Sequence, residues 1–200
     1  MAKARPIRLP ARDFSERPLP VVELALLSAL RVHSLKRPAI NFRLNPAHRF
    51  SHPDAPAGLL YLGESCETCL WECFGDSILD PDSVIPAQQW INQRVSEVTF
   101  KKPLRLCDLT QTAVRSALKV DLSALKHTDL TVPQEWGLAI QNHPKEVDGL
   151  LYSSRFTGKR CLVLFERKKT VSLLKSKVRG KLMDLDEGER FLGDNQITLI

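Results

Sequence analysis

The stretch LLYLGESCETCLWECFGD, residues 59–76, predicts a strand that is followed directly by a helix. Its first four residues are apolar and end at Gly63, as in a short buried strand closed by a turn. Ser65 is a favourable N-cap, and Glu67 places negative charge in the first helical turn. We therefore expect a helix that runs to about Phe74.

Strands and helices mix irregularly on both sides of this stretch. Residues 45–58 contain three prolines and are expected to form a loop. The irregular order of strands and helices favours an α+β fold over a doubly wound parallel sheet. The apolar pattern predicts strands at 39–44, 150–152 and 161–165 and two more within 96–109, and helices at 21–32, 111–119 and 135–142.

The chain has 200 residues, which is enough for one domain with a substantial hydrophobic core. Its 43% hydrophobic and 26% charged residues exclude a disordered, collagen-like or coiled-coil chain. The net charge of +6 is uneven, because residues 1–40 carry +5, residues 41–165 carry −1 and residues 166–200 carry +2. The basic charge therefore belongs to the two ends, and a basic groove through the body is not expected.

The five cysteines are an odd number, and no apolar signal segment precedes them, so we expect a cytoplasmic protein without disulfides or a membrane partner. Cys66, Cys69 and Cys73 follow the spacing C-x2-C-x3-C, which could supply three thiolate ligands to a metal ion. On a helix the same spacing forms one buried face together with Leu70 and Phe74. Because a second C-x2-C pair is missing, we expect the buried face and no metal.

Four polar residues near the opening stretch are candidates for a functional site: Arg43, Arg49, Tyr61 and Glu72. On a helical wheel, Glu72 lies about 120° from the cysteine stripe and can face a cleft rather than the core. Taken singly, each residue also has an ordinary role as a solvated arginine, a core tyrosine or a solvent-facing glutamate. Composition alone does not decide between these roles and a joint site.

Five blocks of sequence have a recognisable order and spacing. They are NFRLNPAHRFSH (41–52), LLYLGES (59–65), ETCLWECFGD (67–76), LCDLT (106–110) and DGLLYSSRFTGKRCLVLFE (148–166). In this order and spacing they resemble a RES domain. Over residues 40–166 the chain thus resembles the toxins of bacterial type II toxin–antitoxin modules, which are usually encoded beside an Xre-type helix-turn-helix antitoxin.

The resemblance implies an ADP-ribosyltransferase-like (diphtheria-toxin-like) fold of mixed small sheets with flanking helices, which consumes NAD+ as a substrate. It implies a catalytic NAD-binding domain at 41–166. An N-terminal arm and helix at 1–40 and a C-terminal extension at 167–200, which we expect to pack on the same domain, lie outside the resemblance. Its functional positions fall on Glu72, Arg49 and Tyr61 as catalytic residues and on Arg43, Arg49, Tyr61 and Ser154 as NAD-binding residues.

One departure from the family pattern concerns residues 48–50. The usual Gly-Arg-Trp reads His48-Arg49-Phe50 in this chain, so the arginine is kept while the glycine turn and the tryptophan are not.

The chemistry of NAD+ cleavage suits the residue types at these positions. Breaking the nicotinamide–ribose bond passes through an oxocarbenium-like state, which a single carboxylate such as Glu72 can stabilise. Arg43 and Arg49 offer forked hydrogen bonds to a pyrophosphate or ribose, and Tyr61 can stack on the nicotinamide. Ser154 can donate to the amide or ribose, and none of these roles requires a metal.

The acceptor of the ADP-ribose is left open by the sequence. The long arms and the altered 48–50 segment favour transfer to a target protein, whereas water or phosphate as acceptor would make the chain an NAD+ glycohydrolase or phosphorylase. A further alternative is a nucleic-acid-binding module that uses the basic arms, of which 167–181 is the most basic, although direct nucleic-acid binding is not expected. The implied protein partner is an Xre-type antitoxin.

Overall fold

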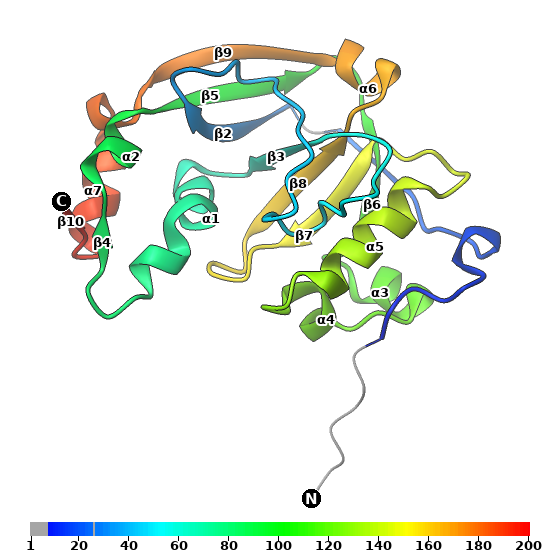
Figure 1. Ribbon diagram of the computed structural model, residues 1–200. Helices are drawn as coiled ribbons and strands as arrows, with labels where there is room; N and C mark the ends of the chain where they lie inside the picture. The colour runs from blue at the N-terminus through cyan, green and yellow to red at the C-terminus, as the bar shows by residue number, and fades with distance from the viewer. Residues whose placement is uncertain (1–7, 26) are drawn as a thin grey trace, which may run out of the picture.

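The computed structural model describes residues 8–25 and 27–200 (Figure 1). Residues 1–7 of the predicted N-terminal arm therefore lie outside the described residues. The strands are β1 (Val22–Leu24), β2 (Ser28–Ser34), β3 (Leu59–Gly63), β4 (Val84–Ile85), β5 (Gln93–Phe100), β6 (Leu104–Asp108), β7 (Gly149–Ser153), β8 (Arg160–Phe165), β9 (Leu174–Lys181) and β10 (Thr198–Leu199). The helices are η1 (Phe14–Glu16), α1 (Cys66–Ile78), α2 (Ala87–Ile91), α3 (Thr112–Leu118), α4 (Leu122–Lys126), α5 (Thr131–Gln141), α6 (Lys168–Ser172), η2 (Leu182–Asp184) and α7 (Asp186–Asp194).

Eight strands form one curled sheet in the order β1-β6-β7-β8-β3-β2-β5-β9. The β6–β7 pair is parallel, and the other neighbours are antiparallel. β4 and β10 form a separate parallel pair. Figure 1 shows β2, β5 and β9 running across one end of the molecule, while α3, α4 and α5 lie together at the other end. This mixture of a curled sheet and flanking helices confirms the α+β class.

Successive side chains of a central strand point to opposite faces of the sheet and pack in two different hydrophobic cores. In β8, Val163 and Phe165 pack with α5 in one cluster, whereas Leu162 and Leu164 pack in a second cluster on the opposite face. Tyr61 lies in β3 on the same side of the sheet as Val163, its register partner. The alternation therefore directs the Tyr61 side chain toward the α5 side of the sheet.

The strand-to-helix stretch at 59–76 folds as predicted. Ser65 caps α1, since its hydroxyl accepts a hydrogen bond from the Thr68 amide at 3.1 Å. The helix continues past the predicted end at Phe74, to Ile78, because Gly75 packs directly under the Phe156 ring. A Cβ at Gly75 would lie 2.5 Å from that ring, so the helix approaches the β7–β8 turn closely.

The predicted helix at 21–32 is wrong, because this segment contains β1 and β2; residue 26 within it lies outside the described residues. All seven residues of β2 pair with β5, from Ser28 opposite Thr99 to Ser34 opposite Gln93. Both faces of β2 are partly covered, which removes the simple alternation that would have indicated a strand. Pairing with a distant strand therefore overrode a local pattern that fits a helix.

The predicted strand at 39–44 is also wrong apart from a single bridge between Arg43 and Leu59. The Arg31 guanidinium donates hydrogen bonds to the carbonyls of Ala39 and Asn41. A side chain thus occupies acceptor groups that a neighbouring strand would otherwise use. The other predicted strands and helices are present, with ends shifted by a few residues.

No helix among the described residues is long and apolar enough to cross a membrane.

Candidate functional site

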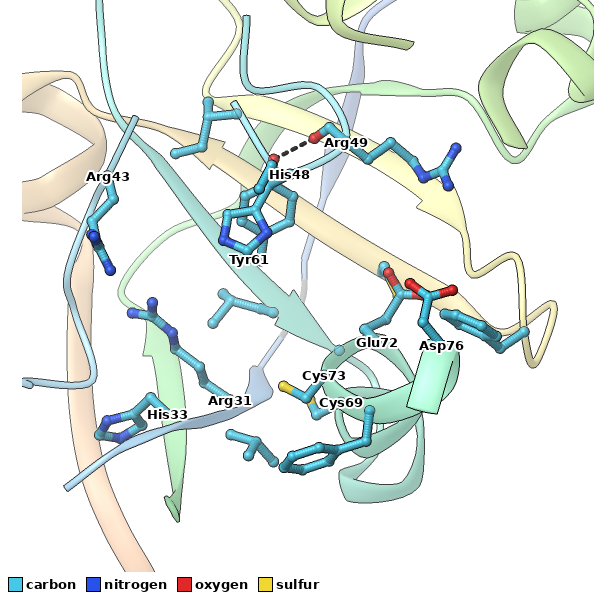
Figure 2. A pocket seen from close by; sticks show the side chains of 18 of the residues that line it. Arg31, His33, Arg43, His48, Arg49, Tyr61, Cys69, Glu72, Cys73 and Asp76 are labelled. Carbon is cyan, nitrogen blue, oxygen red and sulfur yellow. Dashed lines mark hydrogen bonds between the residues drawn. The ribbon is translucent and has the colours of Figure 1, made fainter. Parts of the chain in front are cut away.

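A cavity of about 790 Å³ opens where β2, β3, α1 and the segment before β3 meet. Its size is typical of a small-molecule site. Four of the five residues predicted for a site line it, namely Arg43, Arg49, Tyr61 and Glu72 (Figure 2). Further contributors come from the β7–β8 turn and from Thr128 and Leu130 between α4 and α5.

The Glu72 carboxylate is held by two hydroxyl groups from β7 and the turn that follows it. The Ser154 hydroxyl donates to Oε1 at 2.7 Å, and the Tyr152 hydroxyl donates to Oε2 at 3.0 Å. Residues 152 and 154 are two apart and so project on the same side of the extended chain. One segment thereby fixes both carboxylate oxygens of a glutamate on the exposed side of α1.

Tyr152 remains a hydrogen-bond donor at every ordinary pH. Burial, with the neighbouring charge of Glu72, raises the pKa of Tyr152 well above its usual value. The Phe50 ring packs edge-on against Tyr152, with ring centroids 5.0 Å apart. Ser154, fully buried, does not itself line the cavity and reaches it only through Glu72.

Arg49 is tied to the protein at both its backbone and its side chain. The Tyr61 hydroxyl donates to the Arg49 carbonyl, as the dashed line in Figure 2 marks. The Arg49 guanidinium donates from Nη1 to the carbonyls of Leu125 at 2.7 Å and His127 at 3.0 Å, at the end of α4. Arg49 thus braces the cavity wall as well as lining it, and Tyr61 presents its ring rather than its hydroxyl.

Residues 48–50, where the chain departs from the family pattern, are docked tightly on α5. Phe50 has a φ of 67° and is 1% exposed, so a left-handed backbone turns this ring into the core. A Cβ at Gly137 would lie 2.4 Å from the Phe50 carbonyl oxygen. Gln134 also donates to the His48 carbonyl at 3.1 Å. Phenylalanine in this chain is therefore a core residue that supports the site from behind.

His48 lines the cavity beside Tyr61, with ring centroids 5.5 Å apart. Burial lowers the pKa of His48, and the charges of Arg43 and Arg31 lower it further. The imidazole is therefore neutral at pH 7 and presents an uncharged ring where the family pattern has glycine.

Arg31 is a cavity residue that the sequence prediction missed. Burial lowers the pKa of Arg31 to about 10, and the charge of the neighbouring Arg43 acts in the same direction. Because this pKa is still well above 7, the guanidinium is charged at neutral pH. Figure 2 shows Arg31 and Arg43 pointing toward one another across one end of the cavity. The alternation of apolar and polar residues in LRVHS (30–34) could have indicated a strand that carries Arg31, but most of this segment was predicted as part of a helix.

The two carboxylates that line the cavity lie at the end away from Arg31 and Arg43. Arg31 and Arg43 lie at one end, Glu72 and Asp76 lie at the other, and Tyr61 lies between them (Figure 2). The Asp76 carboxylate is paired with Arg155 from the β7–β8 turn, which leaves Glu72 as the carboxylate without a cationic partner within 4.0 Å among the described residues. The cavity thus suits an elongated ligand with an anionic part and a part that becomes cationic.

The cysteine stripe is a buried face as predicted for Cys66 and Cys69, but Cys73 is exposed and lines the cavity. Cys73 follows Glu72 directly in α1, and both residues lie on the side of the helix that faces the cavity. In the part of the chain that the structure describes, no group of three or more His, Cys, Asp or Glu side chains is arranged to hold a metal ion.

The Tyr152–Glu72 hydrogen bond leads to a testable expectation. Tyr152→Phe removes the donor to Oε2 but keeps the ring against Phe50, so any activity that depends on Glu72 should fall about tenfold. The kcat should carry the loss, because the substitution changes how Glu72 is oriented and not the walls that bind a ligand. A melting temperature within a few degrees of wild type would separate this effect from unfolding. An unchanged kcat would contradict the positioning role.

Comparison with known proteins gives a sequence family and a similar fold. Residues 27–186 match the sequence model of the RES domain family. The fold is similar to the crystal structure of the M. tuberculosis MbcT-MbcA toxin-antitoxin complex, with 18% identity and a TM-score of 0.61 over 86% of this chain and 95% of that chain. The comparison with curated proteins finds no significant match.

Proposed function

Since the chain belongs to the RES domain family, we propose that it is the toxin of a type II toxin–antitoxin module and that it cleaves NAD+ at the nicotinamide–ribose bond. The ADP-ribose is transferred to a target protein. The observation that carries this proposal is the Glu72 carboxylate, fixed by Tyr152 and Ser154 at one end of a cavity whose other end holds Arg31 and Arg43.

Glu72 stabilises the charge that develops during bond cleavage. As the C1′–N bond breaks, its electron pair leaves with nicotinamide and the ribose becomes an oxocarbenium-like cation. A carboxylate already oriented by two hydroxyls requires no reorganisation to balance that charge. Nicotinamide leaves as a neutral base and needs no acid catalyst, so the Glu72 carboxylate alone is sufficient.

Arg31 and Arg43 bind the pyrophosphate of NAD+ in this proposal. Guanidinium groups form forked, charge-assisted hydrogen bonds with phosphate oxygens, and two of them converge at the end of the cavity away from Glu72. The Tyr61 ring lies between the two ends, where the nicotinamide, cationic before cleavage, can stack on it.

The role of Arg43 is tested by comparing Arg43→Ala with Arg43→Lys. Arg43 is exposed and its side chain has no ion pair within 4.0 Å among the described residues, so neither variant should change stability appreciably. Arg43→Ala should raise the KM for NAD+ about tenfold with kcat nearly unchanged, because a phosphate contact contributes to binding before and during cleavage alike. Arg43→Lys should recover part of the affinity. A fall in kcat at constant KM would instead place Arg43 at the reacting bond.

The acceptor is tested with NAD+ labelled in its adenylate part, incubated with the protein and a bacterial lysate. Label attached to a protein band supports transfer to a target protein. Label confined to ADP-ribose or its phosphate ester would identify the chain as a glycohydrolase or a phosphorylase and would overturn the transferase proposal.

An antitoxin partner of the Xre type completes the proposed module. A helix-turn-helix reading frame beside the gene, and suppression of growth arrest when it is co-expressed, would support this partner. Growth arrest on expression of the chain alone that persists in Glu72→Ala would contradict the enzymatic toxin.

A further inference from the structure

One edge of the main sheet is long, open and basic. β9 is the last strand of the eight-stranded sheet and pairs with β5 from Leu174 opposite Phe100 to Lys181 opposite Arg94. On its other side no strand of the described chain, residues 8–25 and 27–200, pairs with it. The opposite edge of the sheet is β1, which has only three residues. β9 therefore presents the longer row of unpaired backbone donors and acceptors.

The side chains along this edge are exposed on both faces. Residues 175–179 are all exposed, and Val178 retains 51% of its surface. Lys175 and Lys177 project on one face, while Ser176 and Val178 project on the other. The edge is thus polar and cationic on one side and small or apolar on the other.

The cations of β9 are not neutralised within the described chain. Arg179 pairs with Glu187 at 2.7 Å, but neither Lys175 nor Lys177 has an ion pair within 4.0 Å among the described residues. The residue opposite Lys177 in the register is Glu97, which is the single acid on β5. The edge therefore keeps a surplus of positive charge.

The positive charge of β9 determines which kind of partner can pair with this edge. Lysines on an open edge disfavour pairing with an identical edge, so a second copy of β9 is repelled. A strand that carries acidic residues at every second position would place them against Lys175 and Lys177. A nucleic acid would satisfy the charge but not the row of backbone groups, which only another peptide backbone matches.

We propose that β9 is a docking strand for an extended acidic segment of a partner protein, which adds to the sheet as a ninth strand. Acidic side chains of that segment lie beside Lys175 and Lys177, and small apolar side chains lie beside Val178. The proposal does not depend on NAD+ cleavage, because β9 contributes no residue to the cavity.

The test uses the full chain and a fluorescein-labelled peptide of eight residues in which Glu and Val alternate, with binding followed by fluorescence anisotropy. The peptide should bind, and binding should weaken at least tenfold in the Lys175→Gln/Lys177→Gln double variant. The matched control is Lys119→Gln/Lys145→Gln, which removes the same charge from exposed positions outside β9, after α3 and between α5 and β7. No binding, or equal weakening in the control, would overturn the proposal.

Strand addition is separated from simple charge attraction by two further peptides of the same sequence, one N-methylated at the odd residues and one at the even residues. A peptide strand faces its neighbour with alternate amides, so one of the two should lose binding at least tenfold and the other should keep it. Equal binding of both would leave charge alone as the cause and overturn the docked strand. Tighter binding of a twenty-nucleotide oligothymidylate than of the acidic peptide would assign the edge to nucleic acid instead.

Discussion

Glu72→Gln is expected to reduce NAD+ consumption about a thousandfold while the protein stays folded. The amide keeps the size of the side chain and can still accept one hydrogen bond from Tyr152 or Ser154, but it lacks the negative charge that balances the developing cation. The loss should appear in kcat with little change in KM, because the charge matters most in the transition state. NAD+ consumption by the purified chain, measured over a range of substrate concentrations, gives both constants.

Glu67→Gln is the matched control for this substitution. Glu67 lies on the same helix and is exposed, and its carboxylate pairs at 2.7 Å with Lys159 on the surface. This variant makes the same chemical change outside the cavity and should retain nearly full activity. Equal activity of the Glu72 and Glu67 variants would show that the Glu72 carboxylate has no role in catalysis.

Gly149→Ala is expected to lower the free energy of unfolding by about 3 kcal/mol or to prevent folding. A Cβ at this position would lie 2.0 Å from the Val163 carbonyl oxygen and 3.0 Å from the Leu164 Cα. Both contacts are backbone atoms of β8, so they can move only if the β7–β8 pair opens. That pair also carries Tyr152 and leads to Ser154, and activity should therefore fall together with stability.

Urea denaturation of Gly149→Ala and Gly193→Ala provides the comparison. A Cβ at Gly193, in α7, would meet no atom within 4 Å, so Gly193→Ala should be neutral or slightly stabilising. An unfolding midpoint for Gly149→Ala equal to that of wild type would contradict the close approach of β7 and β8.

The sequence predicted those parts of the fold that depend on neighbouring residues. The strand before Gly63, the N-cap at Ser65 and the helix that follows rest on contacts within a few positions of one another. The same holds for the paired strands around the turn at Gly158. In these segments the local pattern and the tertiary structure agree.

The parts that the sequence could not predict depend on distant pairing. Residues 28–32 were predicted as part of a helix, because their strand character comes from β5, about sixty residues later in the chain. Because Arg31 was assigned to that helix, no sequence pattern indicated that it lies beside Arg43. Likewise, the hydrogen bond from Tyr152 to Glu72 joins residues 80 positions apart, and no local sequence pattern predicts it.

The candidate site was identified from the sequence through a resemblance, and its geometry from the structure. The cavity brings together Arg43, Arg49, Tyr61 and Glu72, with Ser154 behind Glu72. The structure adds that Arg49 is largely occupied with the end of α4.

The most direct test of the central claim is mass spectrometry of the products formed when the purified wild-type chain, free of any antitoxin, is incubated with NAD+ and an acceptor lysate. Cleavage at the nicotinamide–ribose bond predicts free nicotinamide, released in proportion to the NAD+ consumed, with Glu72→Gln releasing about a thousandth as much in the same time. Unchanged NAD+, or cleavage at the pyrophosphate to give AMP and nicotinamide mononucleotide, would contradict the proposal that Glu72 stabilises a ribosyl cation.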